Sequence, residues 1–211
     1  IGHIMGPAMV SQLLPPLSSV LATKLLAGFG TAAVAAWAVS SRFEFLAIVT
    51  VLALTMTLPP MVGRFFGAGQ FEAIRQLLRI AVGYVLVFQT LVAILVWWWA
   101  PSLAQLMSSD AEVTDIVTWH LMWVPISLGP LGVCMMMVSA ANALGKPYRA
   151  LWMSALRLFA FFLPCLWIGG QIGGLWGLFI GASLANVCAG VAAWWIYQSI
   201  YRTSCHIEHD A

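Results

Sequence analysis

Long, nearly unbroken runs of apolar residues alternate with short polar breaks along this chain of 211 residues. A helix that crosses about 30 Å of hydrocarbon needs about 20 mostly apolar residues. Six runs reach that length, and none has the apolar–polar alternation that is typical of barrel strands. The pattern therefore predicts an all-α membrane protein with six transmembrane helices, over residues 4–28, 33–60, 80–100, 119–142, 150–168 and 174–198.

The polar breaks outline one six-helix unit over residues 1–200, followed by a short polar tail over 201–211. A tight turn is predicted at 28–31, longer polar stretches at 63–79 and 101–118, a short basic break at 145–149 and a short neutral break at 169–173. The first residue is Ile1 rather than Met, and no signal peptide precedes the first run. We therefore expect a fragment of a longer protein.

The composition supports the membrane interpretation. Apolar residues make up 62% of the chain and charged residues only 8%, against about 25% charged in a soluble domain. So few charges exclude a soluble globular enzyme, and so much apolar content excludes a disordered chain. A net charge of +2 argues against nucleic-acid binding, and the four cysteines form neither a C-x-x-C motif nor a disulfide framework.

The distribution of cations predicts the orientation in the membrane. Six cations fall in the second loop, the fourth loop and the tail, and the three opposite loops hold none; the six are Arg64, Arg75, Arg79, Lys146, Arg149 and Arg202. Cytoplasmic loops carry the excess of Lys and Arg, so this side and both ends of the segment are expected to be cytoplasmic. We expect the protein to lie in a plasma membrane, the inner membrane of a bacterium.

Small residues and prolines give the predicted helices two further features. A small residue recurs at every fourth position of the last span, at Gly173, Gly177, Gly181, Ala185, Ala189 and Ala193. This small-residue seam predicts close helix packing inside the bundle, with a dimer interface as the alternative. Pro15 and Pro16 interrupt the first span and are candidate hinges, because interrupted helices are common in transporters.

Charges inside the spans are the candidate functional residues, because such charges are rare and usually face a cavity or a partner. Glu44 lies near the midplane of the second span, and Arg42 lies about 200° around the same helix, so the two cannot pair. Lys24, Arg157 or water are the partners considered for Glu44. Glu44 is either half of a structural ion pair or a protonatable, cation-holding group, whereas Lys24 and Arg157 are expected to reach the membrane interfaces.

Other polar side chains give weaker signals. His120 stands at the start of the fourth span and is expected to be a polar tip at the outer interface. The sequence contains no nucleophile elbow, no H-E-x-x-H and no P-loop. We therefore expect no enzyme activity, no catalytic residue, no metal site and no cofactor.

Several motifs resemble those of the multidrug and toxic compound extrusion (MATE) family. They are AAVAAW at 32–37, SRFE at 41–44 and PMVGRFFGAGQ at 60–70, with GPA at 6–8 and ALGKP at 143–147. The resemblance covers essentially the whole chain, and the second span with its loop is its most specific part. It implies one lobe, in its details the C-terminal one, of a twelve-helix transporter whose two six-helix lobes enclose a central cavity.

The resemblance also implies a function. Such proteins are similar to antiporters that export drugs or organic cations in exchange for H⁺ or Na⁺ by alternating access. Some members carry an acidic residue in the first and fourth helices of this lobe, and here both spans lack one. Glu44 is therefore the one intramembrane acid available for coupling in this segment, unless the coupling acid lies in the N-terminal lobe. That lobe, or a second copy of this chain, is the expected partner.

Two other functions remain open at this stage. Related flippases of the same superfamily move lipid-linked oligosaccharides, and Arg42, Lys24 and Arg157 are the cations that could hold a phosphate. A non-transporting membrane scaffold is the other alternative. It predicts that these charges can be neutralised without a transport defect.

Overall fold

The computed structural model describes residues 13, 17 and 19–209, and within that part every element is helical. A first helical stretch covers residues 19–27. The helices that follow are α2 (Thr31–Gly67), α3 (Phe71–Met107), α4 (Ala111–Ala143), α5 (Pro147–Ala155), the π-helical turn η1 (Leu156–Phe162) and α6 (Leu163–His209). The prediction of an all-α membrane protein is confirmed.

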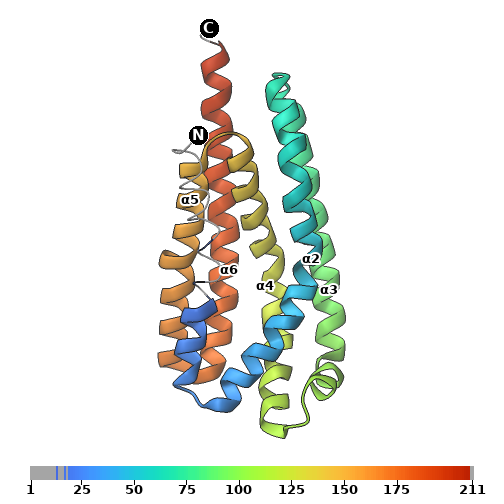
Figure 1. Ribbon diagram of the computed structural model, residues 1–211, viewed down its shortest axis with the longest axis vertical. Coiled ribbons are helices and arrows are strands. Elements are labelled where there is room, and N and C mark those ends of the chain that lie inside the picture. Colours follow the sequence, from blue (N-terminus) through green and yellow to red (C-terminus); the bar gives the residue numbers. More distant parts are fainter. Residues whose placement is uncertain (1–12, 14–16, 18, 210–211) are drawn as a thin grey trace.

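The helices form an elongated up-and-down bundle (Figure 1). Helices α2 and α3 lie side by side as one pair, and α5 with the two parts of α6 forms a second group. Helix α4 lies between the two groups and packs against α2, α3 and α6. Its buried residues run along the whole helix, from Val113 to Ala141, as expected for a helix that has neighbours on several sides.

The residues of the last two predicted spans, 150–168 and 174–198, are helical, and no loop separates them. Helix α5 continues through η1 into the first part of α6, and the chain then reverses at Gly174, where φ is 58° and ψ is −139°. A left-handed φ of this kind is accessible to glycine without steric cost. The two legs, before and after Gly174, therefore run antiparallel (Figure 1).

The helices are longer than the apolar runs predict. The turns at 68–70, 108–110 and 144–146 replace the longer predicted loops, and α6 continues through the predicted polar tail to His209. Polar residues extend the helices beyond the apolar stretches, and Asp110 starts α4 by accepting a 3.0 Å hydrogen bond from the Glu112 backbone N–H. By length and composition, four helical stretches could cross a membrane: Thr31–Gly67, Phe71–Met107, Ala111–Ala143 and Pro147–Gln198.

The predicted basic side is one end of the bundle. The turns at 68–70 and 144–146 lie at the same end as the C-terminus, and the turns at 28–30 and 108–110 lie at the opposite end (Figure 1). Partial burial, and next to it the charge of Arg149, lower the pKa of Lys146 in the second basic turn. Asp110, Glu112 and Asp115 are exposed at the opposite end.

Part of the small-residue seam lies where the two legs of the last helices touch. A Cβ added at Gly177 would overlap the backbone oxygen of Gly169, and one added at Gly181 would overlap that of Cys165. Ala185, Ala189 and Ala193 are buried further along α6. Gly173 differs, because nothing lies within 4 Å of a Cβ placed there.

This contrast predicts how alanine substitutions affect stability. Gly177→Ala should lower the melting temperature of the purified protein in detergent, because the methyl group forces two backbones apart at a cost of about 1–3 kcal/mol. Gly173→Ala is the matched control at the same spacing and should leave the melting temperature unchanged. Equal melting temperatures for the two variants would show that the legs do not meet at Gly177.

Candidate functional site

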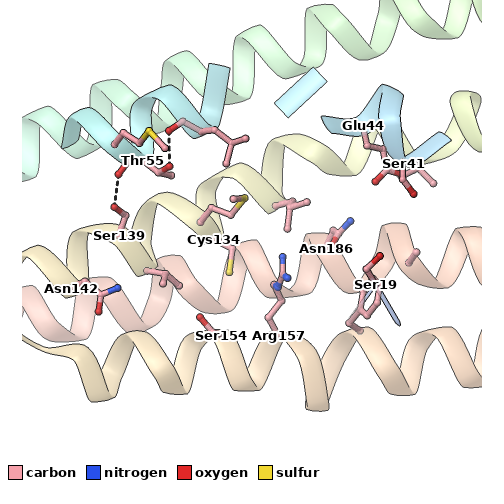
Figure 2. A pocket seen from close by; sticks show the side chains of 18 of the residues that line it. Ser19, Ser41, Glu44, Thr55, Cys134, Ser139, Asn142, Ser154, Arg157 and Asn186 are labelled. Carbon is pink, nitrogen blue, oxygen red and sulfur yellow. Dashed lines mark hydrogen bonds between the residues drawn. The ribbon is translucent and has the colours of Figure 1, made fainter. Parts of the chain in front are cut away.

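A cavity of about 590 Å³ opens between α2, α4, η1 and α6 (Figure 2). Apolar and sulfur-containing side chains make up much of its wall, and polar groups are spaced along its length. The charged and polar lining residues are Ser19, Ser41, Glu44, Thr55, Ser139, Asn142, Ser154, Arg157 and Asn186. Its size and mixed lining are typical of a site for a small organic molecule.

Glu44 on α2 has a partner on α4 rather than any of the partners predicted for it. His120 Nε2 lies 2.6 Å from Glu44 Oε1, a distance that requires a strong hydrogen bond between the two side chains. The prediction that His120 is a polar tip at the outer interface is wrong. Helix α4 begins at Ala111, which places His120 about 13 Å along the helix axis from its start.

Aromatic rings hold the His120 imidazole in place. Trp37 of α2 meets it edge-on with ring centroids 5.7 Å apart, and Phe179 of α6 does the same at 4.9 Å. The imidazole Nδ1 is buried and has no hydrogen-bond partner among the described residues. With the Glu44 side chain as a carboxylate, the short contact is made by Nε2–H of His120 donating to it.

Only one member of the Glu44–His120 pair can be reached from the cavity. The His120 side chain is 1% exposed, whereas the Glu44 side chain is 25% exposed and lines the cavity. Ser41 lies beside it at the same end of the cavity (Figure 2). A proton or cation entering the cavity therefore meets Glu44 first.

Uncharged polar groups link the walls of the cavity. Ser139 Oγ on α4 donates a 2.8 Å hydrogen bond to the backbone oxygen of Thr55 on α2, drawn as a dashed line in Figure 2. Asn186 Nδ2 on α6 donates to Ser127 Oγ on α4 at 3.1 Å. Both bonds cross between helices and fix α4 against its two neighbours in the part of the bundle that encloses the cavity.

Arg157 also faces this cavity (Figure 2). It was expected to reach the cytoplasmic interface, but α5 begins at Pro147, so Arg157 lies about 15 Å along the helix axis from that end. It is the second residue of η1, in which the backbone N–H of Leu163 bonds back to the oxygen of Leu158. No hydrogen bond or ion pair to Arg157 is present in the described residues.

The other predicted residues lie away from the cavity or outside the described structure. Lys24 is exposed on the first helical stretch, and Arg42 is exposed on α2 and is not part of the cavity lining. Of the small-residue seam, Gly177 and Gly181 pack within the chain. The hinge candidates Pro15 and Pro16 lie outside the described residues.

The sequence does not predict the roles of two residues of the site. The predicted depth of His120 is wrong, because the fourth apolar run starts at residue 119 whereas α4 starts at Ala111. Asn186 was not singled out, although a lone amide in an apolar span is a known sign of an interhelical hydrogen bond. No sequence signal points to the aromatic contacts of Trp37 and Phe179.

Comparison with known proteins places the chain in a family. Residues 7–168 match the MatE family. The chain belongs to the MATE family. This confirms the predicted resemblance to that family.

The FAD transporter of Shewanella oneidensis is a curated relative, 32% identical over 200 residues, or 95% of this chain and 44% of that protein. Among solved structures, the MATE transporter VcmN of Vibrio cholerae in its bent form is 64% identical, with a TM-score of 0.93 over 96% of this chain and 46% of VcmN. A transporter from Pyrococcus furiosus shares the fold at 18% identity, with a TM-score of 0.87. The chain spans less than half the length of these relatives.

Paired replacement of Glu44 and His120 tests the energetic coupling within the site. His120→Phe alone should lower the melting temperature in detergent, because it leaves a half-buried carboxylate without its donor, at a cost of about 1–3 kcal/mol. The double variant with Glu44→Leu removes both polar partners and should recover part of that loss. If the effects of the two single changes simply add in the double variant, the two side chains do not interact.

Proposed function

We propose that this chain is one lobe of a secondary active efflux transporter and that the Glu44–His120 pair is its proton-coupling group. The observation that carries the proposal is a carboxylate that lines a membrane cavity and is bonded to a buried imidazole at 2.6 Å. Ionisable groups inside a membrane typically mark ion pathways and proton relays. The second lobe, or a second copy of this chain, would complete the transporter.

The arrangement suits a proton better than a metal ion as the coupling ion. The Nε2–H of His120 can keep donating to one carboxylate oxygen of Glu44 while a proton from the cavity binds to the other. A hard cation such as Na⁺ prefers several oxygen ligands, and here a ring nitrogen occupies one side of the carboxylate. The other charged residue of the cavity is Arg157, while Lys24 and Arg42 are exposed on their helices and lie outside the cavity lining.

Proton binding at Glu44 would change how α2 is held to α4. Glu44 and His120 join these helices towards one end of the cavity, and Ser139 and Thr55 join them farther along. Neutralising the carboxylate weakens the first of these bonds, since a charge-assisted hydrogen bond is roughly twice as strong as a neutral one. This local change would bias the lobe between the two conformations of alternating access. Both ends of the segment would lie at the cytoplasmic side of a plasma membrane.

The transported substrate is an organic molecule of the size of the cavity. Drugs and organic cations are the substrates predicted from the family resemblance, and a flavin nucleotide is a second candidate because a relative is named as an FAD transporter. A lipid-linked oligosaccharide flippase and a non-transporting scaffold are the remaining alternatives. The charge of Arg157 in the cavity bears on whether the substrate is a cation or an anion.

Replacement of Glu44 tests the coupling function. In the full-length transporter reconstituted into liposomes, Glu44→Gln should reduce transport driven by an imposed pH gradient to about the level of empty liposomes. The reason is that Gln cannot take up and release the proton. His120→Phe should reduce the rate as well, because it removes the group that orients the carboxylate.

Arg42→Gln is the matched control, because Arg42 is an exposed charge on the same helix. It should leave pH-driven transport unchanged, and all variants should insert into membranes at the level of the original protein. Undiminished pH-driven transport by Glu44→Gln would remove Glu44 from the mechanism. Transport by the original full-length protein that does not exceed the level of empty liposomes would favour the scaffold.

A further inference from the structure

The cavity holds a second charge that the proposed coupling step does not use. The side chain of Arg157 is half-buried and faces the cavity, and no described residue supplies it with an anion. Taking an arginine to membrane depth without a counter-charge costs free energy, and such residues usually mark substrate or ion pathways. A negatively charged group of a bound ligand would supply the missing partner.

The cavity offers no equivalent site for a cation. Glu44 is the one carboxylate among its described lining residues, and that carboxylate is already bonded to His120. A cationic ligand would have to compete with the imidazole, whereas an anionic ligand meets no competitor at Arg157. The charge balance of the cavity therefore favours an anion, in contrast to the cationic substrates predicted from the family resemblance.

The local backbone also sets Arg157 apart. It lies in the π-helical turn η1, directly upstream of Pro164, which lacks the N–H that a regular helix would use. π-Helical turns occur mostly as single turns inside α-helices, and they are frequent at functional sites. In Figure 2 the Arg157 side chain points from this turn into the cavity, towards α4.

The rest of the lining indicates what the anion is attached to. Met135 and Val138 of α4 and Phe162 of η1 give the wall an apolar character. The side-chain oxygen of Asn142 is buried with no partner in the described structure and could accept a hydrogen bond from a ligand. An apolar or aromatic body with a few polar groups fits this lining.

We propose that Arg157 binds the anionic group, a phosphate or carboxylate, of a soluble organic substrate with an apolar or aromatic body. The planar guanidinium can hold such a group through two parallel hydrogen bonds. The proposal rests on the transport function above and names the substrate class of the same cavity. Because proton and anion bind to different residues, they are coupled through the movement of the helices rather than by direct displacement.

Flavin mononucleotide and riboflavin are a matched pair of probes, because they differ by one phosphate. With the full-length protein in nanodiscs of phosphatidylcholine, flavin mononucleotide should bind about tenfold or more tightly than riboflavin, measured by flavin fluorescence. Arg157→Gln should remove this difference and Arg157→Lys should restore part of it. Arg149→Gln, on the same continuous helix but outside the cavity lining, is the control and should keep the full difference.

The absence of flavin mononucleotide binding, equal binding of the two flavins, or a preference that survives in Arg157→Gln would overturn the proposal. Nanodiscs that contain phosphatidylglycerol distinguish a soluble anion from a lipid phosphate. If phosphatidylglycerol abolishes the Arg157-dependent binding of flavin mononucleotide, Arg157 binds a lipid headgroup rather than a soluble anion, and the proposal is overturned. Binding is measured without a pH gradient. The binding of flavin mononucleotide at Arg157 can therefore be absent while Glu44-dependent transport is present, and it can be present while that transport is absent.

Discussion

The hydrogen bond between Glu44 and His120 is the interaction on which the arrangement of this lobe depends. A carboxylate at membrane depth is tolerated only with a partner, and here the partner comes from the central helix α4. The bond joins α2 to α4, and the ring contact between His120 and Phe179 extends the connection to a third helix, α6. One short polar contact and one ring contact therefore connect three helices at the end of the cavity that Glu44 lines.

Four other polar groups inside the bundle also have partners on a neighbouring helix. Ser139, Thr55, Asn186 and Ser127 bond across α4 to its neighbours, whereas the aromatic and aliphatic side chains of the outer faces are exposed, as expected for a surface that contacts lipid. Arg157 is the exception, since its charge has no counterpart in the described structure. The cavity thus contains a carboxylate with a hydrogen-bond partner and a guanidinium with no partner in the described structure. The guanidinium can therefore bind a ligand.

Hydropathy was sufficient to predict the helical membrane fold, because a long continuous apolar run in a bilayer satisfies its backbone hydrogen bonds as a helix. It could not place the helix ends, since polar first turns such as Asp110–Glu112 continue a helix beyond the hydrocarbon. The same error put His120 at the interface and Arg157 near the cytoplasm. The sequence indicated that Glu44 needs a partner, but periodicity along one helix carries no information on which face of another helix it meets. The π-helical turn that carries Arg157 has no reliable sequence signal beyond Pro164.

The proposed coupling step requires that Glu44, held by His120, gains and loses a proton. Infrared difference spectroscopy of the full-length protein in lipid, between alkaline and acidic buffer, observes this directly through the C=O stretching band of a protonated carboxylic acid. If Glu44 takes up the proton, the spectrum contains a band that disappears in Glu44→Gln and shifts in frequency in His120→Phe, where the hydrogen-bond donor is lost. An identical difference spectrum for the original protein and Glu44→Gln would show that Glu44 does not take up a proton in this pH range.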